Sequence, residues 1–168
     1  MNAMRSFPEW SLLPPPVGAV VEMAGFPSSI VELKDQSFRG AFKLTVQRAR
    51  VREIFEGRRD YGMYTFPCFS VDQPTDHGFS GSPVFHEGRL CGLVSGGSVT
   101  DETYVATLWP LSLREIEYPN LGALNKKEKL ADWFESRRLR AVDWQRVRDR
   151  AAISSDDQDR PYAFLRAT

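Results

Sequence analysis

The spacing of residues that interrupt regular structure limits the fold of this 168-residue chain more than any other sequence feature. From Gly18 to Asn120, short apolar or alternating runs are separated by glycine, proline, aspartate and serine at intervals of roughly ten residues. Runs of this length are typical of β-strands and are too short for most helices. We therefore expect an all-β domain with strands at 18–24, 41–55, 61–69, 82–86, 89–95 and 103–109.

Two details of this region bear on how the strands are placed. Phe42, Leu44 and Val46 alternate with polar residues, which predicts a strand with one apolar face and one wet face. The charged run EGRRDYG at 56–62 predicts a solvated turn at the tip of a hairpin rather than a binding patch.

The two ends of the chain differ in texture from the middle. Three consecutive prolines, Pro14 to Pro16, favour an extended backbone that joins neither a helix nor a sheet. The expected organisation is an extended linker (1–17), a β domain (18–121) and a helical C-terminal appendage with a tail (122–168).

The C-terminal appendage shows apolar residues at helical spacing. They indicate a helix over 126–138, with Asn125 just before it as the expected cap. A second, shorter helix should run from Asp143 to Arg150, followed by a loop over 154–159.

Charge and apolar length exclude several classes of partner. Lysine plus arginine number 22 and aspartate plus glutamate number 22, so the zero net charge gives no bulk attraction to nucleic acid or anionic membranes. Residues 126–150 hold nine basic and five acidic residues, which we interpret as a solvated helix surface rather than a nucleic-acid site. The chain has no run of about 18 apolar residues and no signal-peptide pattern, so we expect no membrane span and a cytoplasmic protein.

Cysteine and histidine are scarce. Cys68 and Cys91 belong to no CxxC pair, so we expect reduced thiols in the core, with a disulfide between them as the alternative. His77 and His86 are the only histidines, too few for a histidine-based metal site. We predict no metal and no cofactor.

The segment GFSGSPVF at 78–85 carries the strongest chemical signal. Gly78 and Gly81 bracket Ser80, and glycine allows backbone conformations that are closed to other residues. Two amides, of Gly78 and Ser80, can then point at one oxygen and stabilise an oxyanion. A plain turn rich in glycine and serine is the alternative. The G-x-S-x-G elbow of esterases does not fit, because Ser82 stands at the second glycine position and a strand follows.

GFSGSPVF together with the following GRLCGLVSGG (88–97) resembles the nucleophile segment of trypsin-like (chymotrypsin-fold) serine peptidases, including their HtrA-like bacterial branch. Residues 20–27 resemble the first strand of that family's second barrel, 103–111 its last strand and 126–138 its C-terminal helix. The resemblance implies an antiparallel β-barrel of about six strands, the second half of a trypsin-like double barrel, with a C-terminal helical appendage.

The resemblance also implies roles for individual residues. Ser80 matches the nucleophile, and the amides of Gly78 and Ser80 match the oxyanion hole. Ser95, Gly96 and Gly97 match the strand that pairs with substrate backbone, where glycine leaves room for the substrate side chain that precedes the cleaved bond (P1). Pro74 and Thr75 fall at the floor of the specificity pocket, and their lack of charge indicates a small or apolar P1 residue.

The chain also departs from the family. Phe79 stands where many secreted relatives carry an aspartate, so activation by an ion pair to a new N-terminus is not expected. The family's catalytic histidine and aspartate lie in a first barrel, and only 17 residues precede the expected β domain. His77, three residues before Ser80, is poorly placed as a substitute base, and His86 is interpreted as a surface residue.

The expected function is that of a serine endopeptidase domain which acts on polypeptides and is inactive alone. It would need a first-barrel segment, a partner chain or a second copy. A non-catalytic peptide- or protein-binding module derived from such a protease is the alternative. A third hypothesis, an unrelated β-barrel adaptor with a basic helical tail, would be favoured if Ser80 were buried.

Overall fold

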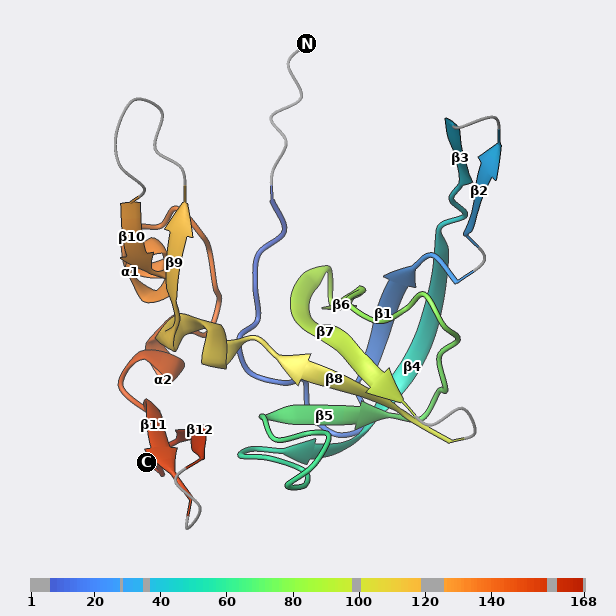
Figure 1. Cartoon of the computed structure of the whole chain (residues 1–168). Helices are drawn as coiled ribbons and strands as arrows, with labels where there is room; N and C mark the ends of the chain where they lie inside the picture. Colours follow the sequence, from blue (N-terminus) through green and yellow to red (C-terminus); the bar gives the residue numbers. More distant parts are fainter. Residues whose placement is uncertain are drawn as a thin grey trace.

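A closed six-stranded antiparallel barrel forms the main body of the computed structural model, which describes residues 7–27, 29–34, 37–97, 101–118, 126–156 and 160–167 (Figure 1). Around the barrel the strand order is β1-β4-β5-β8-β7-β6. The bounds are β1 Val20–Gly25, β4 Thr45–Phe55, β5 Cys68–Val71, β6 Pro83–His86, β7 Arg89–Gly97 and β8 Thr103–Thr107. The predicted all-β fold and six-stranded antiparallel barrel are confirmed.

The barrel closes where β1 pairs with β6, through Glu22 opposite Phe85 and Met23 opposite Val84. Its interior is filled by buried apolar side chains from all six strands and from the turn that precedes β6. They are Val21, Met23, Ala49, Val51, Phe69, Val71, Phe79, Val84, Cys91, Val94 and Val105.

The expected strand over 61–69 is wrong for most of its length, because β5 begins only at Cys68. The carboxylate of Asp60 accepts hydrogen bonds from the amides of Gly62, Met63 and Tyr64 at 2.8, 2.7 and 3.2 Å. These bonds fold the segment into a compact loop, since amides that are bonded to a side chain cannot join a strand ladder. The same bonds, that of Gly62 first, hold the pKa of Asp60 below its ordinary value.

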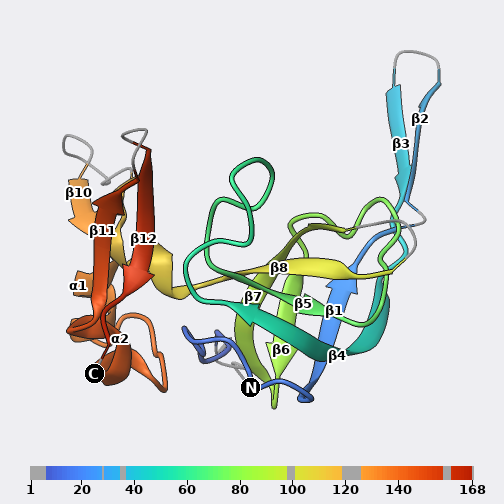
Figure 2. The ribbon, with the colours of Figure 1, turned by 90° about the horizontal axis from the view of Figure 1, so that it is seen from below.

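A hairpin that the sequence analysis did not predict precedes β4. It consists of β2 (Ile30–Lys34) and β3 (Ser37–Ala41), which pair only with each other and project from the barrel in Figure 2. Beyond it, the apolar face predicted for 42–46 points away from the barrel: Phe42, Leu44 and Val46 are 70%, 59% and 57% exposed.

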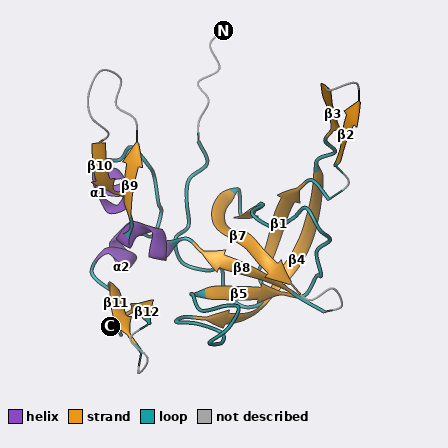
Figure 3. Ribbon diagram, viewed as in Figure 1, coloured by secondary structure: helices purple, strands orange, loops and turns teal. Residues whose placement is uncertain are grey.

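The C-terminal part is a second, smaller unit that contains all the helices of the described residues (Figure 3). It holds a 3-10 helix η1 (Trp109–Leu113), hairpin strands β9 (Glu115–Tyr118) and β10 (Lys126–Lys129), helices α1 (Leu130–Glu135) and α2 (Trp144–Arg148), and hairpin strands β11 (Ala151–Ser155) and β12 (Pro161–Leu165).

The helix predicted over 126–138 is therefore too long. Residues 126–129 pair with 115–118 as a strand instead, and α1 starts at Leu130 after Lys129. It ends at Glu135 with Ser136 as its C-cap, and Arg137 follows with a left-handed φ of 58°. The expected cap Asn125 and the boundary at residue 121 lie outside the described residues.

The second helix is confirmed as α2, which ends at Arg148 rather than Arg150. The loop expected over 154–159 is replaced at its start by β11, which includes Ser154 and Ser155, and residues 157–159 lie outside the described part.

The segment before the prolines lies between the two units and is bonded to both. The Ser11 amide donates to the Leu90 carbonyl of β7 at 2.8 Å, and the Trp10 amide donates to the Arg140 carbonyl at 2.8 Å. Leu12 is fully buried in the core of the C-terminal unit, with Leu108, Trp109, Leu130, Phe134, Trp144 and Val147. This part of the expected linker is extended, but it is built into the fold.

Asp143 fixes this segment in place. Its carboxylate accepts the amides of Leu12 and Leu13, each at 2.8 Å, instead of capping the helix that follows it. Asp143 is itself buried, so these bonds replace the water that its charge would otherwise need.

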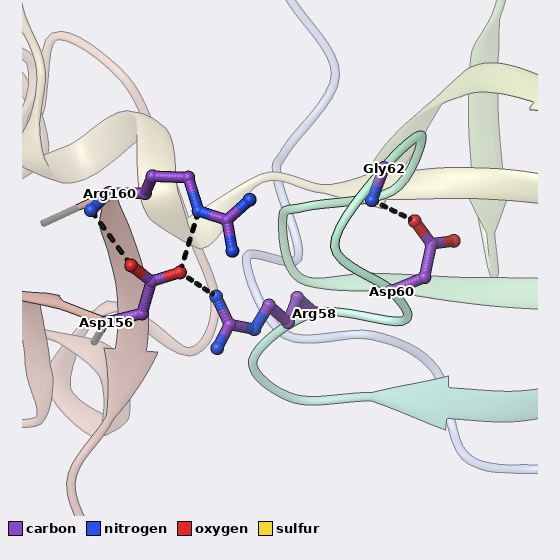
Figure 4. A network of polar contacts seen from close by, with 5 residues as sticks. All are labelled: Arg58, Asp60, Gly62, Asp156 and Arg160. Carbon is purple, nitrogen blue, oxygen red and sulfur yellow. Dashed lines mark hydrogen bonds and ion pairs between the residues drawn. The ribbon is translucent and has the colours of Figure 1, made fainter. Parts of the chain in front are cut away.

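A second polar link joins the two units through the run expected to be a solvated tip. Arg58 donates to the Asp156 carboxylate at 3.0 Å, and Arg160 donates to the same oxygen at 2.9 Å (Figure 4). The side chain of Asp156 is only 3% exposed. The run 56–62 lies in the connection between the antiparallel strands β4 and β5, and Glu56, Arg59, Tyr61 and Gly62 are exposed, so the predicted hairpin tip is confirmed for these residues. The prediction did not include the contact that Arg58 makes with the C-terminal unit through Asp156.

Asp143→Ala should lower the free energy of unfolding by about 2–4 kcal/mol, because two amides lose a charged acceptor and one of them is buried. Urea denaturation followed by tryptophan fluorescence measures this change. The control variant Asp149→Ala removes an exposed carboxylate at the C-terminal end of α2 and should change the free energy of unfolding little. Equal losses in the two variants would contradict the role given to Asp143.

The thiols of Cys68 and Cys91 are free and buried, as expected, and the alternative of a disulfide is excluded. Burial raises the pKa of Cys68 to about 11 and that of Cys91 to about 12.

The stability of the protein should therefore depend on pH in the alkaline range. A cysteine thiol in the unfolded chain ionises near pH 8.5, so the free energy of unfolding should fall as the pH rises from about 9 towards 12. Urea titrations at pH 8, 9 and 10 measure the slope, which a Cys68→Ala/Cys91→Ala variant should reduce. Rapid reaction of the folded protein with a thiol reagent at pH 8 would contradict this prediction.

Candidate functional site

Ser80 lies on an exposed turn between β5 and β6, and the residues next to it hold that turn to the barrel. The Phe79 side chain is fully buried in the barrel core. The Gly81 amide donates to the Val94 carbonyl at 2.7 Å, and the Val94 amide donates to the Ser82 carbonyl at 2.9 Å. The hydroxyl-bearing residue is thus presented to solvent on a backbone that is fixed on both sides.

Glycine is required at position 78 for two separate reasons. Its φ of 99° is left-handed, which side chains other than glycine rarely adopt. A Cβ there would also lie 2.7 Å from the Phe26 carbonyl oxygen and 2.9 Å from the Pro27 Cα. Gly81 shares the left-handed conformation, with φ of 80°, but faces open space.

A cavity of about 500 Å³ opens beside Ser80. It brings together four of the other predicted site residues, Thr75, Ser95, Gly96 and Gly97, while Pro74 and Gly78 are not in its lining. The remaining lining residues are Pro27, Met63, Tyr64, Asp76 and His77.

Met63 and Tyr64 were missed from the sequence because their segment was interpreted as a strand. The signal that could have found them is Asp60, whose carboxylate folds the loop and carries both residues to the cavity. An aspartate two residues before a glycine is a common turn former, but the direction of the loop depends on the rest of the fold.

The two glycines of β7 in the cavity lie close to other groups of the chain. A Cβ at Gly96 would lie 3.0 Å from the Tyr64 hydroxyl, and one at Gly97 would lie 2.7 Å from the Glu102 carbonyl oxygen. Both glycines therefore make room for groups of the chain itself. That they also leave room for a substrate side chain stays a prediction.

Tyr64 forms a fixed wall of the cavity. Its ring stacks on Tyr104 at 4.2 Å between centroids, and the Arg59 guanidinium lies 4.3 Å from the Tyr104 ring centroid. Burial raises the pKa of Tyr64, and burial with a hydrogen bond to Glu102 raises the pKa of Tyr104 to about 12. Both phenols stay neutral near pH 7.

The floor of the cavity at Thr75 is polar and uncharged. The Thr103 hydroxyl lies 2.8 Å from the Gln73 carbonyl oxygen and 3.0 Å from the Thr75 hydroxyl. These hydroxyls carry no charge, and the carboxylate in the cavity lining is that of the neighbouring Asp76.

The site residues differ in what they are bonded to. Within the described part of the chain, no hydrogen bond uses the amide of Gly78 or Ser80, or the Ser80 hydroxyl. His77 is exposed and lines the same cavity as Ser80. His86 lies at the end of β6, and its Nδ1 contacts the Val20 carbonyl oxygen at 3.0 Å.

The described residues contain no group of three or more histidine, cysteine, aspartate or glutamate side chains arranged to hold a metal ion. None of their helices is long and apolar enough to cross a membrane.

Comparison with known proteins gives similarity to solved structures only. No protein-family model matches the chain, and no curated protein matches it. The structure is similar to a crystal structure of Rv3671c from M. tuberculosis H37Rv, a serine-to-alanine mutant in an inactive form, with 22% identity and a TM-score of 0.45. It is also similar to an inactive form of the Rv3671c protease, with 22% identity and a TM-score of 0.46. Each match covers 63% of this chain and 50% or 51% of the other, so the chain spans about half the length of these proteins.

Gly78→Ala and Gly81→Ala form a matched pair that tests the turn. Both put a side chain at a left-handed position, which costs about 1 kcal/mol. Only the methyl at position 78 also meets backbone atoms below 3.0 Å. The loss of unfolding free energy should therefore be clearly larger for Gly78→Ala, as measured by urea denaturation. Equal losses would show that position 78 has more space than the structure gives it.

Proposed function

We propose that the chain is the nucleophile-bearing barrel of a trypsin-like serine endopeptidase, which cleaves polypeptides through an acyl-enzyme on Ser80. The observation that carries this proposal is the exposed Ser80 turn, on which two neighbouring amides have no partner among the described residues and a cavity adjoins the hydroxyl. The HtrA-like branch rests on the sequence resemblance alone and is part of the proposal.

The chemistry needs four contributions, of which these residues would supply three. Ser80 provides the attacking oxygen, and the amides of Gly78 and Ser80 would donate to the oxyanion of the tetrahedral intermediate, a term worth about 10²–10³ in rate for each donor. Ser95 and the adjoining backbone of β7 would bind the substrate chain. The missing contribution is a base, because a serine hydroxyl near neutral pH must lose its proton to a neighbour as it attacks.

We infer that the base and its orienting carboxylate come from outside these residues, from a first-barrel segment, a partner chain or a second copy. His77 is the only histidine that lines the cavity, and no hydrogen bond within the described residues joins it to Ser80. The exposed apolar side chains Phe42, Leu44 and Val46 give such a partner a surface to cover.

The uncharged Thr75 in the cavity lining supports a small or apolar P1 residue. A basic P1 side chain that contacts Thr75 would bury a charge beside a neutral hydroxyl, and the nearest carboxylate in the lining is that of the neighbouring Asp76. Tyr64 further limits the width of the site, because its hydroxyl occupies the space in front of Gly96.

A second candidate is a non-catalytic module that binds polypeptide segments in the same cavity. The observation that favours it is the lack, within the described residues, of any hydrogen-bonded base at the Ser80 hydroxyl. Such a module would retain the cavity and the edge of β7 but need no proton transfer.

The purified chain alone should show no turnover of peptide substrates in an ordinary protease assay, because enzymes stripped of their triad retain only about 10³–10⁴ over the uncatalysed rate. Adding a first-barrel segment that carries histidine and aspartate should restore both turnover and labelling of Ser80 by a fluorophosphonate. Each sample is compared with Ser80→Ala, which should abolish both signals.

Two results would contradict the proposal in different ways. Turnover by the isolated chain that is lost in Ser80→Ala and His77→Ala would identify His77 as the base. Binding of peptides that persists unchanged in Ser80→Ala, with no labelling under any condition, would favour the binding module.

A further inference from the structure

A groove lies on the C-terminal unit, away from the Ser80 cavity and with no residue in common with it. It consists of two hollows of about 630 and 510 Å³ that share Glu9, Arg137, Leu139 and Arg140. The turn after α1 supplies one side, and the segment before the prolines supplies the other. Two exposed arginines therefore stand between two adjoining hollows.

The backbone at Arg137 is unusual for its residue type. It follows the end of α1 with a φ of 58°, a position where helices generally place glycine. Arginine is strained there, so nothing in the local fold favours it over glycine. Strained residues that persist in a fold tend to be those with a functional role.

The acidic side chains around the groove have partners within the protein, whereas two of its arginines have none among the described residues. Glu135 accepts a hydrogen bond from Trp144 Nε1 at 3.0 Å and lies 3.8 Å from Arg148, while Glu9 lies 3.8 Å from Arg89. Asp143 is bonded to the amides of Leu12 and Leu13. In contrast, no ion pair or hydrogen bond of the described residues uses the guanidinium of Arg137 or Arg140. The groove thus offers two unpaired cations beside acidic groups that already face partners of their own.

The lining of the groove indicates the kind of ligand. Apolar side chains reach solvent there, with Val142 53% and Phe7 85% exposed, whereas the rings of Phe134 and Trp144 are only 4% and 8% exposed. Glu9 and Glu135 line the same groove, which disfavours a ligand with a negative charge on every residue, such as nucleic acid. Two arginines beside exposed apolar side chains instead suit carboxylates on a chain that also carries apolar side chains.

We propose that this groove binds an acidic, apolar segment of a partner polypeptide, with Arg137 and Arg140 pairing with its carboxylates. The interaction is independent of Ser80 and of any peptidase activity. It would give the protein a second contact with a substrate or an assembly partner, on the unit opposite the barrel.

Fluorescence anisotropy of the full chain tests the proposal with a labelled peptide of alternating glutamate and leucine. The same peptide with lysine in place of glutamate, and a single-stranded oligonucleotide of equal negative charge, are the comparison ligands. The acidic peptide should bind most tightly, and Arg137→Gly/Arg140→Gln should weaken it about tenfold or more, the loss expected for a charge-assisted pair. The matched control Arg39→Gln/Lys43→Gln removes the same charge from the exposed region around β3 and should leave binding unchanged.

Arg137→Gly alone separates function from folding. Because glycine relieves the left-handed strain, the midpoint of urea unfolding should rise while peptide affinity falls. The proposal is overturned if the acidic peptide binds no more tightly than the lysine peptide, if both double variants lose affinity equally, or if the oligonucleotide binds best. A lower unfolding midpoint in Arg137→Gly would overturn the argument from strain.

Discussion

Closure of the barrel between β1 and β6 is the constraint on which the position of Ser80 depends. Only two residue pairs make this closure, and they bring the end of β1 beside the turn that leads into β6. Phe26 and Pro27 then lie against Gly78, and the Phe26 amide donates to the Gly78 carbonyl at 3.3 Å. Phe79 fills the core from the same turn. The serine is exposed because the residues on either side of it are needed for packing and for strand pairing.

The strands of the barrel could be predicted from the sequence because their signal is local. Short apolar runs between turn residues indicate where a strand lies, as in β1, β6, β7 and β8, although the ends differ by up to two residues. The direction of a face is not local, and Val46 illustrates this: the alternation was read correctly, but the neighbouring Ala49 and Val51 determine which side points inward. The same limit explains residues 126–129, where pairing with the preceding strand β9 outweighs a helical pattern.

The candidate site was predictable in part for a similar reason. Ser80 and its glycines are adjacent in sequence, so their geometry follows from a few residues. The wall at Tyr64 depends on three bonds to Asp60 and on contact with Tyr104, none of which a linear pattern reveals. Two aspartates were harder to predict, because Asp143 binds the Leu12 amide and Asp156 binds Arg58, groups far away along the chain.

The bond between Leu12 and Asp143 joins residues 131 positions apart, which has a consequence for how the protein is made. During synthesis the barrel residues leave the ribosome well before Asp143, while residues 9–13 must wait for the C-terminal unit. Contacts of such long separation carry a high loop-closure entropy and tend to form late. The order of assembly is therefore expected to be barrel first and C-terminal unit second, with the first described residues of the chain among the last to be locked in place.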